Sequence, residues 1–550
     1  MTKYIFVTGG VISGLGKGIT SASIGALLKE MGYKVSIIKC DPYLNIDPGT
    51  QNPFEHGETY VTHDGMECDL DLGHYERFLN SETCRMSNMT SGQIYETILG
   101  KERRGDFQGQ TVQVVPHVTE EIQTRIIRLG VNKKSDIVIC EIGGTVGDIE
   151  SLPFLEAIRQ MQKKVGRENC CYVHLSYVPY ISSSGEVKTK PTQHSVKELR
   201  SIGITPDIII CRTSKEIDFN SELKNKISIF CDVDQQDVIE GNDVSDIYEV
   251  PLNYYKQKLH LRICDHLKLN KNIECDMSKW KAYIKKQCKG EVKIGIVGKY
   301  IGCQDAYKSI EESLKHAAKK NGVNLVISKI DAENIPKTKM GDITNCDGLL
   351  VPGGFGKRGF EGKVDVASIA YTYKIPYFGI CLGMQAAVVA AARRSNMLED
   401  VNSTEFDPDC NNPVICMMEE QKAITDMGGT MRLGDYECIF VGDENNIALK
   451  SYAKGYDFLD YNFSIIERHR HRYEFNEEYE SILSTDACGI VVCGRDKKTG
   501  LVEIIQGMNH PWYIGVQFHP EFKSSPLKPH PLFVDFIRSA KENRSKKNEE

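Results

Sequence analysis

The sequence predicts an α/β protein of two domains, each built on a mainly parallel sheet that is covered by helices. In the first half of the chain, short apolar segments typical of strands alternate with segments of helical spacing. A polar, lysine-rich stretch at 265–291 interrupts this alternation, and a second alternating series follows directly. Such alternation predicts parallel strands with helices on both faces of the sheet. A chain of 550 residues is also too long for one ordinary domain.

The first series starts with KYIFVTGG (3–10), an apolar strand that ends in glycines. SASIGALLKEMGY (21–33) has helical spacing, and KVSIIKCD (34–41) is the next strand. Further strand-like runs lie at 135–144, 170–179 and 205–213. Since ligands of parallel sheets bind beyond the carboxyl ends of the strands, the polar residues found there are candidate ligand contacts. They are Gly9, Gly10, Lys39, Asp41 and Glu141 to Gly144.

The second series starts with VKIGIVGKY (292–300) and continues through the runs at 346–354, 375–383 and 513–521. The last residues are highly charged, which is typical of a frayed end. We therefore expect a first domain at 1–268, a linker at 269–291, a second domain at 292–540 and a charged flexible tail at 541–550.

The composition of 41% hydrophobic and 26% charged residues is that of a globular protein. A formal net charge of -7 argues against nucleic-acid binding, which needs a basic face. No apolar run reaches the length of a membrane span, and the first residues lack a signal-peptide pattern, so we expect no membrane contact. The nineteen cysteines contain no C-x-x-C pair, which argues against a disulfide framework or a zinc site. We expect most of them to be buried thiols in a reducing cytoplasm.

One cysteine has a different context. PYFGICLGMQ places Cys381 between Gly379 and Gly383, the arrangement of a nucleophile on a tight turn from strand to helix. Backbone N–H groups at the start of a helix would lower the thiol pKa and stabilise a developing oxyanion. QFHPE supplies His519 as the base and Glu521 as its orienting carboxylate. A lone cysteine is more often a buried apolar residue, but the second glycine loop, VPGGFGKRG, favours the catalytic interpretation.

These motifs resemble the class I glutamine amidotransferase domain over about 292–540. The resemblance implies that Cys381 attacks the glutamine amide, that His519 moves the proton and that Glu521 holds the histidine. Gly354 and Leu382 would supply the oxyanion-binding N–H groups. The glutamine contacts that the resemblance implies are Gly354, Leu382, Gly383, Met384, Gln385, Glu405 and Arg472. A surface salt bridge is a fair interpretation of the neighbouring Arg468 and Arg470.

In the first domain, VTGGVISGLGKGIT (7–20) differs from the P-loop pattern. Its glycines are one residue too far apart, and Gly18 follows Lys17 where a Ser or Thr should stand. The loop alone could be a nucleotide site or a glycine-rich turn. Asp71 and Glu141 are candidate ligands for Mg²⁺, which combines one or two carboxylates with phosphate oxygens. Without a hydroxyl after Lys17, we expect magnesium to depend on these two carboxylates.

A second informative stretch is SSSGEVKTKPTQHSVKELR (182–200). Lys188 and Lys190 lie two apart in what we expect to be an extended segment closed by Pro191. Two cations followed by hydroxyl and amide donors suit a triphosphate and a pyrimidine or ribose edge. A charged exposed loop is the alternative.

Together, these motifs resemble the CTP synthase family over nearly the whole chain. The resemblance implies a first domain like dethiobiotin synthetase, ATP-dependent phosphorylation of O4 of UTP, and displacement of that phosphate by ammonia from the second domain. It implies Mg²⁺ as cofactor, GTP as activator, CTP as inhibitor, homotetramers and filaments. The implied ATP contacts are Ser13, Gly14, Leu15, Gly16, Lys17, Gly18, Lys39, Asp71, Asp243 and Val244. The implied UTP and CTP contacts are Ser13, Asp148, Ile149, Glu150, Lys188, Thr189, Lys190, Pro191, Thr192, Gln193 and Lys226. The implied GTP-responsive lid contains Arg358 and Gly359.

Two positions depart from the family pattern. Thr59 replaces the usual valine of the tunnel segment, and Asn242 stands where many members carry a basic residue. A different ATP-dependent amidotransferase would keep Cys381 but gives no reason for VKTKPTQHS. A filament protein without activity would have lost its nucleophile, base or phosphate lysines, and all of them are present.

Overall fold

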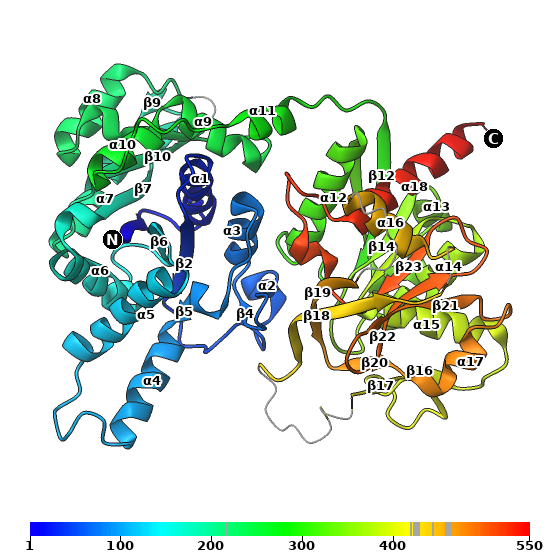
Figure 1. Ribbon diagram of the computed structural model, residues 1–550. Coiled ribbons are helices and arrows are strands. Elements are labelled where there is room, and N and C mark those ends of the chain that lie inside the picture. Colours follow the sequence, from blue (N-terminus) through cyan, green and yellow to red (C-terminus); the bar gives the residue numbers. More distant parts are fainter. Residues whose placement is uncertain (215–216, 419–420, 422–428, 443–444, 457–463, 550) are drawn as a thin grey trace. The chain divides into compact units, whose positions relative to one another are not determined.

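The computed structural model describes residues 1–214, 217–418, 421, 429–442, 445–456 and 464–549 (Figure 1). The chain forms two compact units, Met1–Asp47 with Asp71–Lys285 and Pro48–Leu70 with Lys286–Glu550. Residues 48–70 thus belong to the second unit, although we expected them in the first domain. They fold as α2 (Pro53–His56) and the short hairpin of β3 (Tyr60–Val61) and β4 (Glu67–Cys68).

The sheet of the first unit has seven strands, and every neighbouring pair is parallel. Their order is β11-β10-β7-β1-β6-β2-β5. The strands are β1 (Lys3–Gly9), β2 (Val35–Asp41), β5 (Asn88–Thr90), β6 (Ile137–Ile142), β7 (Cys170–Tyr177), β10 (Ile208–Thr213) and β11 (Val238–Asn242). Because a parallel sheet is buried on both faces, its central strands are nearly continuous apolar runs, which is why the sequence pattern located them.

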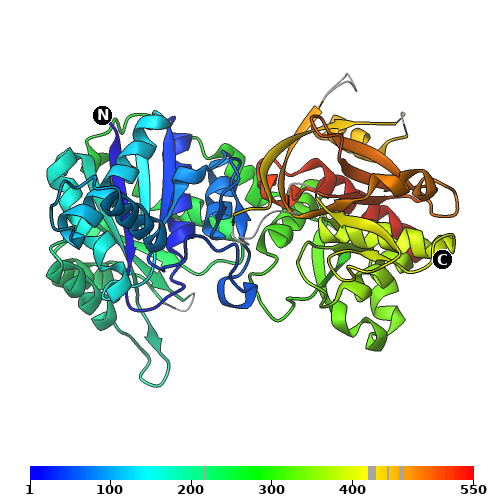
Figure 2. The same ribbon diagram turned by 90° about the horizontal axis from the view of Figure 1, so that it is seen from below.

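Helices cover both faces of this sheet (Figures 1 and 2). Alternate strand residues such as Phe6 and Tyr172 pack with α5 (Thr119–Asn132) and α6 (Leu152–Val165). The opposite face packs against α1 (Lys17–Glu30), whose Gly25 lies against Ile37 and Ile139. The other helices of this unit are α3 (Asp71–Leu79), α4 (Ser91–Arg103), α7 (Lys190–Ser201), α8 (Ser221–Cys231), α9 (Val250–Lys256) and α10 (Leu259–Leu267). A two-residue ladder of β8 (Tyr180–Ile181) and β9 (Glu186–Val187) precedes α7.

Part of the expected linker is packed on the first unit. It contains α11 (Ser278–Lys285), whose Trp280 is fully buried. The Trp280 ring lies 5.7 Å from that of Phe78 and 6.2 Å from that of Tyr248, both in the first unit. The aromatic side chain therefore anchors this helix on the first unit.

The second unit contains a nine-stranded mixed sheet in the order β13-β12-β14-β15-β23-β22-β21-β18-β19. Neighbouring strands are parallel from β13 to β23 and antiparallel from β23 to β19. The sequence pattern located strands of the parallel half and missed the antiparallel extension. In sheet order, the strands are β13 (Asn324–Asp331), β12 (Glu291–Gly298), β14 (Gly348–Val351), β15 (Tyr377–Ile380), β23 (Tyr513–Val516), β22 (Val502–Gly507), β21 (Ile490–Asp496), β18 (Arg432–Phe440) and β19 (Ser464–His471). A second sheet joins β16 (Val401–Ser403), β17 (Asn412–Met417) and β20 (Tyr473–Phe475).

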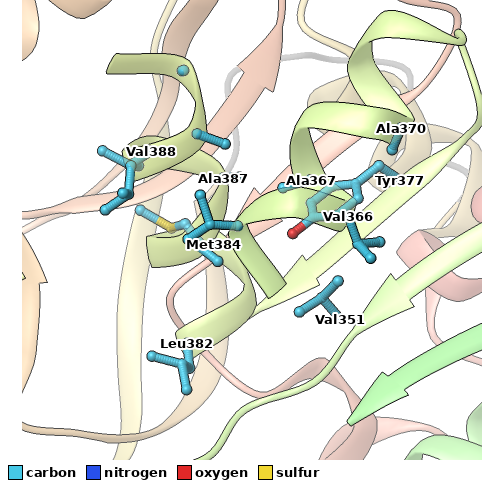
Figure 3. Close-up of a cluster of buried hydrophobic side chains, with 14 of the residues drawn as sticks. Val351, Val366, Ala367, Ala370, Tyr377, Leu382, Met384, Ala387 and Val388 are labelled. Carbon is cyan, nitrogen blue, oxygen red and sulfur yellow. The ribbon is translucent and has the colours of Figure 1, made fainter. Parts of the chain in front are cut away.

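Two apolar cores hold helices against opposite faces of the main sheet. On one face, Tyr377 and Val351 pack with side chains of α14 (Phe360–Thr372) and α15 (Leu382–Ser395), as Figure 3 shows. On the other face, Phe378 packs among α12 (Lys308–Asn321) and α18 (Pro531–Glu549). The described part of the expected tail, 541–549, continues α18 instead of forming a flexible end. The remaining helices are α13 (Met340–Thr344), α16 (Ile447–Tyr456) and α17 (Glu480–Leu483).

The cysteines are free thiols, and all but Cys288, Cys303 and Cys416 are buried. Among the helices that the structure describes, none combines the length and the apolar character needed to cross a bilayer.

Candidate functional site

Cys381 lies on a turn between β15 and α15 in the second unit. Its backbone has φ 51° and ψ -106°, a conformation that a non-glycine residue adopts only under constraint. A Cβ at Gly379 would lie 2.6 Å from the Gly383 carbonyl oxygen, and a Cβ at Gly383 would lie 2.0 Å from that of Val351. Only glycine fits at both positions, so the two glycines allow the turn that presents the thiol at the helix start.

His519 and Glu521 follow β23 and border the same turn. Glu521 Oε1 lies 2.7 Å from His519 Nδ1, and both side chains are buried. His519 Nε2 is buried and has no hydrogen-bond partner among the described residues. A Cβ at Gly353 would lie 3.0 Å from His519 Cε1 and 3.5 Å from Cys381 Cβ, so the imidazole and the cysteine flank the same glycine. The carboxylate thus fixes one ring nitrogen and leaves the other available for proton transfer.

The charge environment favours a protonated imidazole. Burial alone would lower the pKa of His519, but the Glu521 carboxylate and the Cys381 thiol raise it to about 10. A stabilised imidazolium beside a cysteine favours the thiolate form of that cysteine, which is the nucleophilic form.

A cavity of about 1000 Å³ opens beside these residues within the second unit. Its lining includes Cys381, His519 and Glu521 as well as the expected contacts Gly354, Glu405, Arg472 and Arg358. Gly49 to Phe54 and Gly57 to Thr59 also line the cavity, so the segment before β3 forms part of this site.

The other expected glutamine contacts do not line the cavity. Leu382, Gly383, Met384 and Gln385 are buried in the first turn of α15, and the lid residue Gly359 is also absent from the lining. Gln385 Nε2 donates to the Tyr473 carbonyl oxygen at 3.0 Å and to Gln517 Oε1 at 3.3 Å. Because its amide group is used inside the protein, Gln385 supports its neighbours instead of facing the cavity.

Gln517 was missed by the sequence reasoning, although it stands in the same motif as His519. Its Nε2 donates to Cys381 Sγ at 3.6 Å, while its Oε1 accepts from Gln385. The amide thus contacts the candidate nucleophile directly. Its position two residues before His519 was the signal that could have identified it.

Arg468 and Arg470 both form ion pairs, as a salt-bridge interpretation predicts, but the placement of Arg468 on the surface is wrong. Arg468 is fully buried; its Nε donates to Asp435 at 3.2 Å and its Nη1 to the Val61 carbonyl oxygen at 3.1 Å. Arg470 donates to Glu67 at 2.8 Å and lines the cavity. Both arginines therefore hold residues 48–70 within the second unit, a role that the linear motif does not reveal.

Charged groups of the cavity wall contact protein partners. Glu405 Oε1 accepts from the Gly356 N–H at 2.7 Å, and Arg472 Nη2 donates to Thr430 Oγ1 at 2.9 Å. Arg358 forms an ion pair with Glu333. A carboxylate and guanidinium groups therefore border one cavity, as the recognition of an amino acid's ammonium and carboxylate requires.

In the first unit, the opening glycine loop ends where α1 begins at Lys17. Lys17 Nζ donates to the Gly144 carbonyl oxygen at 2.6 Å, and burial lowers the pKa of Lys17. A Cβ at Gly9 would lie 2.9 Å from Lys17 Cδ, and one at Gly18 would lie 2.1 Å from Asp71 Oδ1. Glycine at these positions lets the lysine and the carboxylate approach the loop closely. The upstream loop residues Ser13 and Gly14 are exposed, Gly16 is half-buried and Leu15 is buried.

Lys39 joins the two candidate metal ligands. Its ammonium contacts Asp71 directly and lies 3.2 Å from Glu141 Oε1, while Tyr75 donates to the other oxygen of Glu141. Burial would raise the pKa of Asp71, but the charge of Lys39 lowers it below its usual value. Burial raises the pKa of Glu141, which Lys39 offsets only in part.

The arrangement fits a cation. Two carboxylates converge on one positive group beside a glycine that leaves room for them, which is the donor chemistry of a Mg²⁺ site completed by phosphate oxygens. Among the described residues, no cluster of three or more His, Cys, Asp or Glu side chains could hold a metal ion. A metal ion at Asp71 and Glu141 would therefore need further ligands such as phosphate oxygens.

The segment 188–193, expected to be extended and to bind a pyrimidine nucleotide, is largely the start of a helix. Lys188 follows β9 and pairs with Glu186, whereas Lys190 is the first residue of α7 and Pro191 lies in its first turn. The extended part ends before Thr189, whose backbone is already helical, and Pro191 suits the helix start that follows. In the same helix, Thr192 is buried and Gln193 Nε2 donates to Thr189 Oγ1 at 3.0 Å.

The remaining expected contacts lie on loops and helices of the first unit. Asp148, Ile149 and Glu150 are exposed after β6, and Asp148 accepts from the Thr145 N–H at 2.7 Å. Lys226 is exposed on α8. Asp243 follows β11 and accepts from Arg212 at 2.5 Å, and Val244 is half-buried beside it.

Both units match known families. Residues 3–269 match the family described as CTP synthase N-terminus, and residues 303–539 match glutamine amidotransferase class-I. The chain is 52% identical over 542 residues to the CTP synthase of Clostridium acetobutylicum, covering 98% of each chain. It is 53% identical over 545 residues to that of Protochlamydia amoebophila, again covering 98% of each. A solved glutaminase domain of Trypanosoma brucei CTPS with bound acivicin is 33% identical and covers 46% of this chain and 94% of its own, with a TM-score of 0.40.

Proposed function

The chain belongs to the CTP synthase family of ligases (EC 6.3.4.2), and from this premise we propose how its residues aminate UTP. The second unit hydrolyses glutamine with Cys381, His519 and Glu521, and the first unit uses ATP to activate the uracil O4 for attack by the released ammonia. The observation that carries the proposal is the cysteine at the start of α15 beside a histidine held by a carboxylate, all three bordering one cavity.

In the glutaminase reaction, the Cys381 thiolate attacks the carboxamide carbon and forms a tetrahedral intermediate. The N–H groups of Gly354 and Leu382 stabilise its oxyanion. The imidazolium of His519 donates a proton to the leaving amine, and ammonia departs to leave a thioester. Water activated by His519 then hydrolyses the thioester and regenerates the thiolate. Glu521 holds the ring orientation throughout, as its bond to Nδ1 indicates.

Glu405 and Arg472 orient the substrate through its ammonium and carboxylate groups. Both residues border the cavity that contains Cys381, which supports this assignment. Gly383, Met384 and Gln385 support the site from within α15, whereas Leu382 contributes its main-chain N–H to the oxyanion.

In the synthase reaction, phosphoryl transfer from ATP to O4 of UTP needs positioning and charge neutralisation more than covalent help. Ser13 to Gly18 form the loop around the phosphates, with Lys17 and Lys39 supplying positive charge. Mg²⁺ held by Asp71 and Glu141 would neutralise phosphate charge when bound. Asp243 and Val244 contact the adenine side, while Asp148 to Glu150, Lys188 to Gln193 and Lys226 hold UTP or the inhibitor CTP.

Regulation and assembly complete the proposal. GTP activates through the lid that carries Arg358 and Gly359, ammonia passes through an internal tunnel, and the chain forms homotetramers that assemble into filaments. The aromatic environment of Arg358, which lies 5.3 Å above the Tyr300 ring, supports a base-binding role of this lid.

The decisive experiment supplies the protein with UTP, ATP and Mg²⁺ and either glutamine or ammonium chloride, and measures CTP. We expect CTP with both nitrogen sources and stoichiometric glutamate with glutamine. No CTP from either source would refute the proposed function. CTP from ammonium alone would refute the glutaminase assignment.

A further inference from the structure

Two buried lysines contact the glycine loop that borders Cys381. This loop, Pro352–Gly356, follows β14 and precedes α14. Lys363 of α14 donates from Nζ to the Pro352 carbonyl oxygen at 2.7 Å and to that of Gly353 at 3.3 Å. The first half of the loop is thus bound through two successive carbonyl groups.

Lys299 binds the second half of the same loop. It directly follows β12, and its Nζ donates to the carbonyl oxygens of Phe355 and of Gly356, the latter at 3.1 Å. Four of the five loop carbonyls therefore accept a lysine hydrogen bond, and the exception is that of Gly354. We call Lys299 and Lys363 the two-lysine clamp.

The burial of these lysines is costly. Lys363 is 0% exposed and Lys299 is 5% exposed. Among the described residues, neither has a carboxylate within ion-pair distance. Each ammonium exchanges water for main-chain carbonyl oxygens, and Lys299 Nζ also lies 5.5 Å from the centre of the Tyr300 ring. Lysine is almost never fully buried without a charged partner, because desolvation of an ammonium is expensive. The hydrogen bonds to the loop carbonyls offset part of this desolvation cost.

The carbonyl contacts also set the directions of N–H groups. In a trans peptide, the C=O of one residue and the N–H of the next point in opposite directions. Lys299 holds the Phe355 C=O, and the N–H of the same peptide, that of Gly356, points the other way and donates to Glu405 at 2.7 Å. By the same geometry, the hold of Lys363 on the Gly353 C=O turns the Gly354 N–H away from Lys363.

The reactive groups lie beside this part of the loop. A Cβ at Gly353 would meet His519 Cε1 at 3.0 Å and Cys381 Cβ at 3.5 Å. A Cβ at Gly354 would meet Lys299 Cε at 3.4 Å and Lys363 Nζ at 3.7 Å. The loop therefore passes between the lysine side chains and the Cys381–His519 pair, with the Gly353–Gly354 peptide at the closest approach.

We propose that the two-lysine clamp positions the Gly354 N–H for the oxyanion of the glutaminase reaction. The inference rests on the proposed function and adds two positioning residues to it, neither of which touches substrate. The ammonium groups bind the outward carbonyls, and the N–H donor is thereby fixed before the tetrahedral intermediate forms. A donor fixed in advance needs no reorganisation during the reaction, which is the source of its catalytic benefit.

The test replaces each lysine by methionine, which keeps the length of the chain and removes the donors. Lys363→Met and Lys299→Met are compared with Lys320→Met, a change at an exposed lysine of α12. We expect glutaminase kcat to fall about 10- to 100-fold in both clamp variants, since a misplaced oxyanion donor costs up to about 10³-fold. KM for glutamine should stay within about threefold, because the donor acts on the transition state. Lys320→Met should match the unmodified protein.

A second measurement separates loop positioning from an effect on the thiol. The rate of Cys381 alkylation by iodoacetamide, corrected with Cys381→Ala, reports the thiolate and involves no oxyanion. We expect unchanged alkylation, and unchanged protection by glutamine, in both clamp variants. This protection also verifies that the glutamine site is folded.

Two outcomes would overturn the proposal. An unchanged kcat in both variants would exclude positioning by the clamp. A parallel fall of kcat and alkylation would show that the lysines act on the charge of Cys381 instead. If a methionine variant fails to fold, Lys363→Leu and Lys299→Leu, which also remove the donors, are measured by the same criteria. Absence of glutaminase activity in the unmodified protein would instead refute the proposed function on which the inference rests, and this result is distinct from a loss confined to the clamp variants.

Discussion

The charged groups of the two candidate sites are stabilised by different kinds of contact. In the second unit, His519 is bonded to Glu521 and lies beside Cys381, so the reacting groups are already neighbours. In the first unit, Lys17 is bonded to the Gly144 carbonyl and Lys39 to Asp71, so each candidate phosphate ligand is bound to a protein group.

The difference follows from the chemistry proposed for each unit. A thiol nucleophile needs its base within contact distance, and this geometry must come from the protein. Phosphoryl transfer instead needs charged side chains that can bind the nucleotide phosphates and a metal ion. Before these ligands bind, the same side chains can pair with each other within the protein. In the second unit, contacts among the catalytic groups themselves fix the site. In the first unit, the charges of the candidate ligands are neutralised by contacts with other protein groups.

The largest expected effect is that of Cys381→Ala. Removal of the nucleophile should reduce glutamine-dependent CTP formation at least ~10⁴-fold. Ammonium-dependent formation should stay within about twofold, because the proposed nucleotide site is built from residues of the other unit. Parallel assays with the two nitrogen sources measure both. Loss of both activities in a folded variant would contradict the separation of the two sites.

Lys17→Met and Lys39→Met test the first unit. Each should reduce CTP formation about 10³-fold with either nitrogen source, since each removes a phosphate-binding charge. Glutamine hydrolysis should survive in both.

The same two variants should differ in stability. Lys39→Met leaves Asp71 and Glu141 without their shared cation and should cost about 3–5 kcal/mol. Lys17→Met removes a contact with a carbonyl and a charge that acts on Glu141 and Asp71 without an ion pair, so its cost should be smaller and it serves as the comparison. Melting curves with and without Mg²⁺ measure this, and Mg²⁺ should restore part of the stability of Lys39→Met. Equal melting temperatures for the two variants would contradict the ion-pair account.

Glu521→Gln tests the preorganisation of the second unit. Without the carboxylate, the pKa of His519 should fall from about 10, so less imidazolium is present beside Cys381. Glutaminase kcat should fall about 10²-fold, the range of a general acid–base contribution. The pH profile of iodoacetamide alkylation should move upward. An unchanged profile would show that Glu521 does not stabilise the imidazolium.

The smallest effect concerns stability and pH at Lys363. Burial and the charge of Lys299 lower its pKa from 10.5 to about 7. Between these values the unfolded chain binds the proton more readily, so stability should rise with pH through this window, by at most about 1.4 kcal/mol per unit. Urea midpoints at pH 7 and pH 9 should therefore show a smaller rise for Lys363→Met than for the unmodified protein. Equal rises would exclude a depressed lysine pKa.

Much of the fold was predictable because the apolar runs in the sequence coincide with the strands that are buried in the sheets. The apolar runs at 3–10 and 135–144 became β1 and β6, since strands buried on both faces must be apolar throughout. The antiparallel strands were not predicted: β18, for example, is mostly half-buried and includes charged residues such as Arg432. Half-exposed strands resemble loops in a single sequence.

The candidate glutaminase residues were predictable because each stands in a short motif whose chemistry is local. Gly379 and Gly383 specify the turn around Cys381, and two positions separate His519 from Glu521. Gln517 and the two lysines were not identified, because their importance lies in what they contact. Lys299 and Lys363 are 64 positions apart in the chain and meet only at the glycine loop.

The sequence by itself determined the two alternating series, the elbow at Cys381 and the glycine loop at Lys17, because each depends on residues within a few positions of one another. Only the tertiary structure decided that residues 48–70 join the second unit, that Arg468 is buried and that lysines bind the loop beside Cys381. Arg468 Nη1 donates to Tyr60 Oη at 3.2 Å across 408 positions of chain. Such contacts depend on how whole elements pack, and no local spacing in the sequence encodes them.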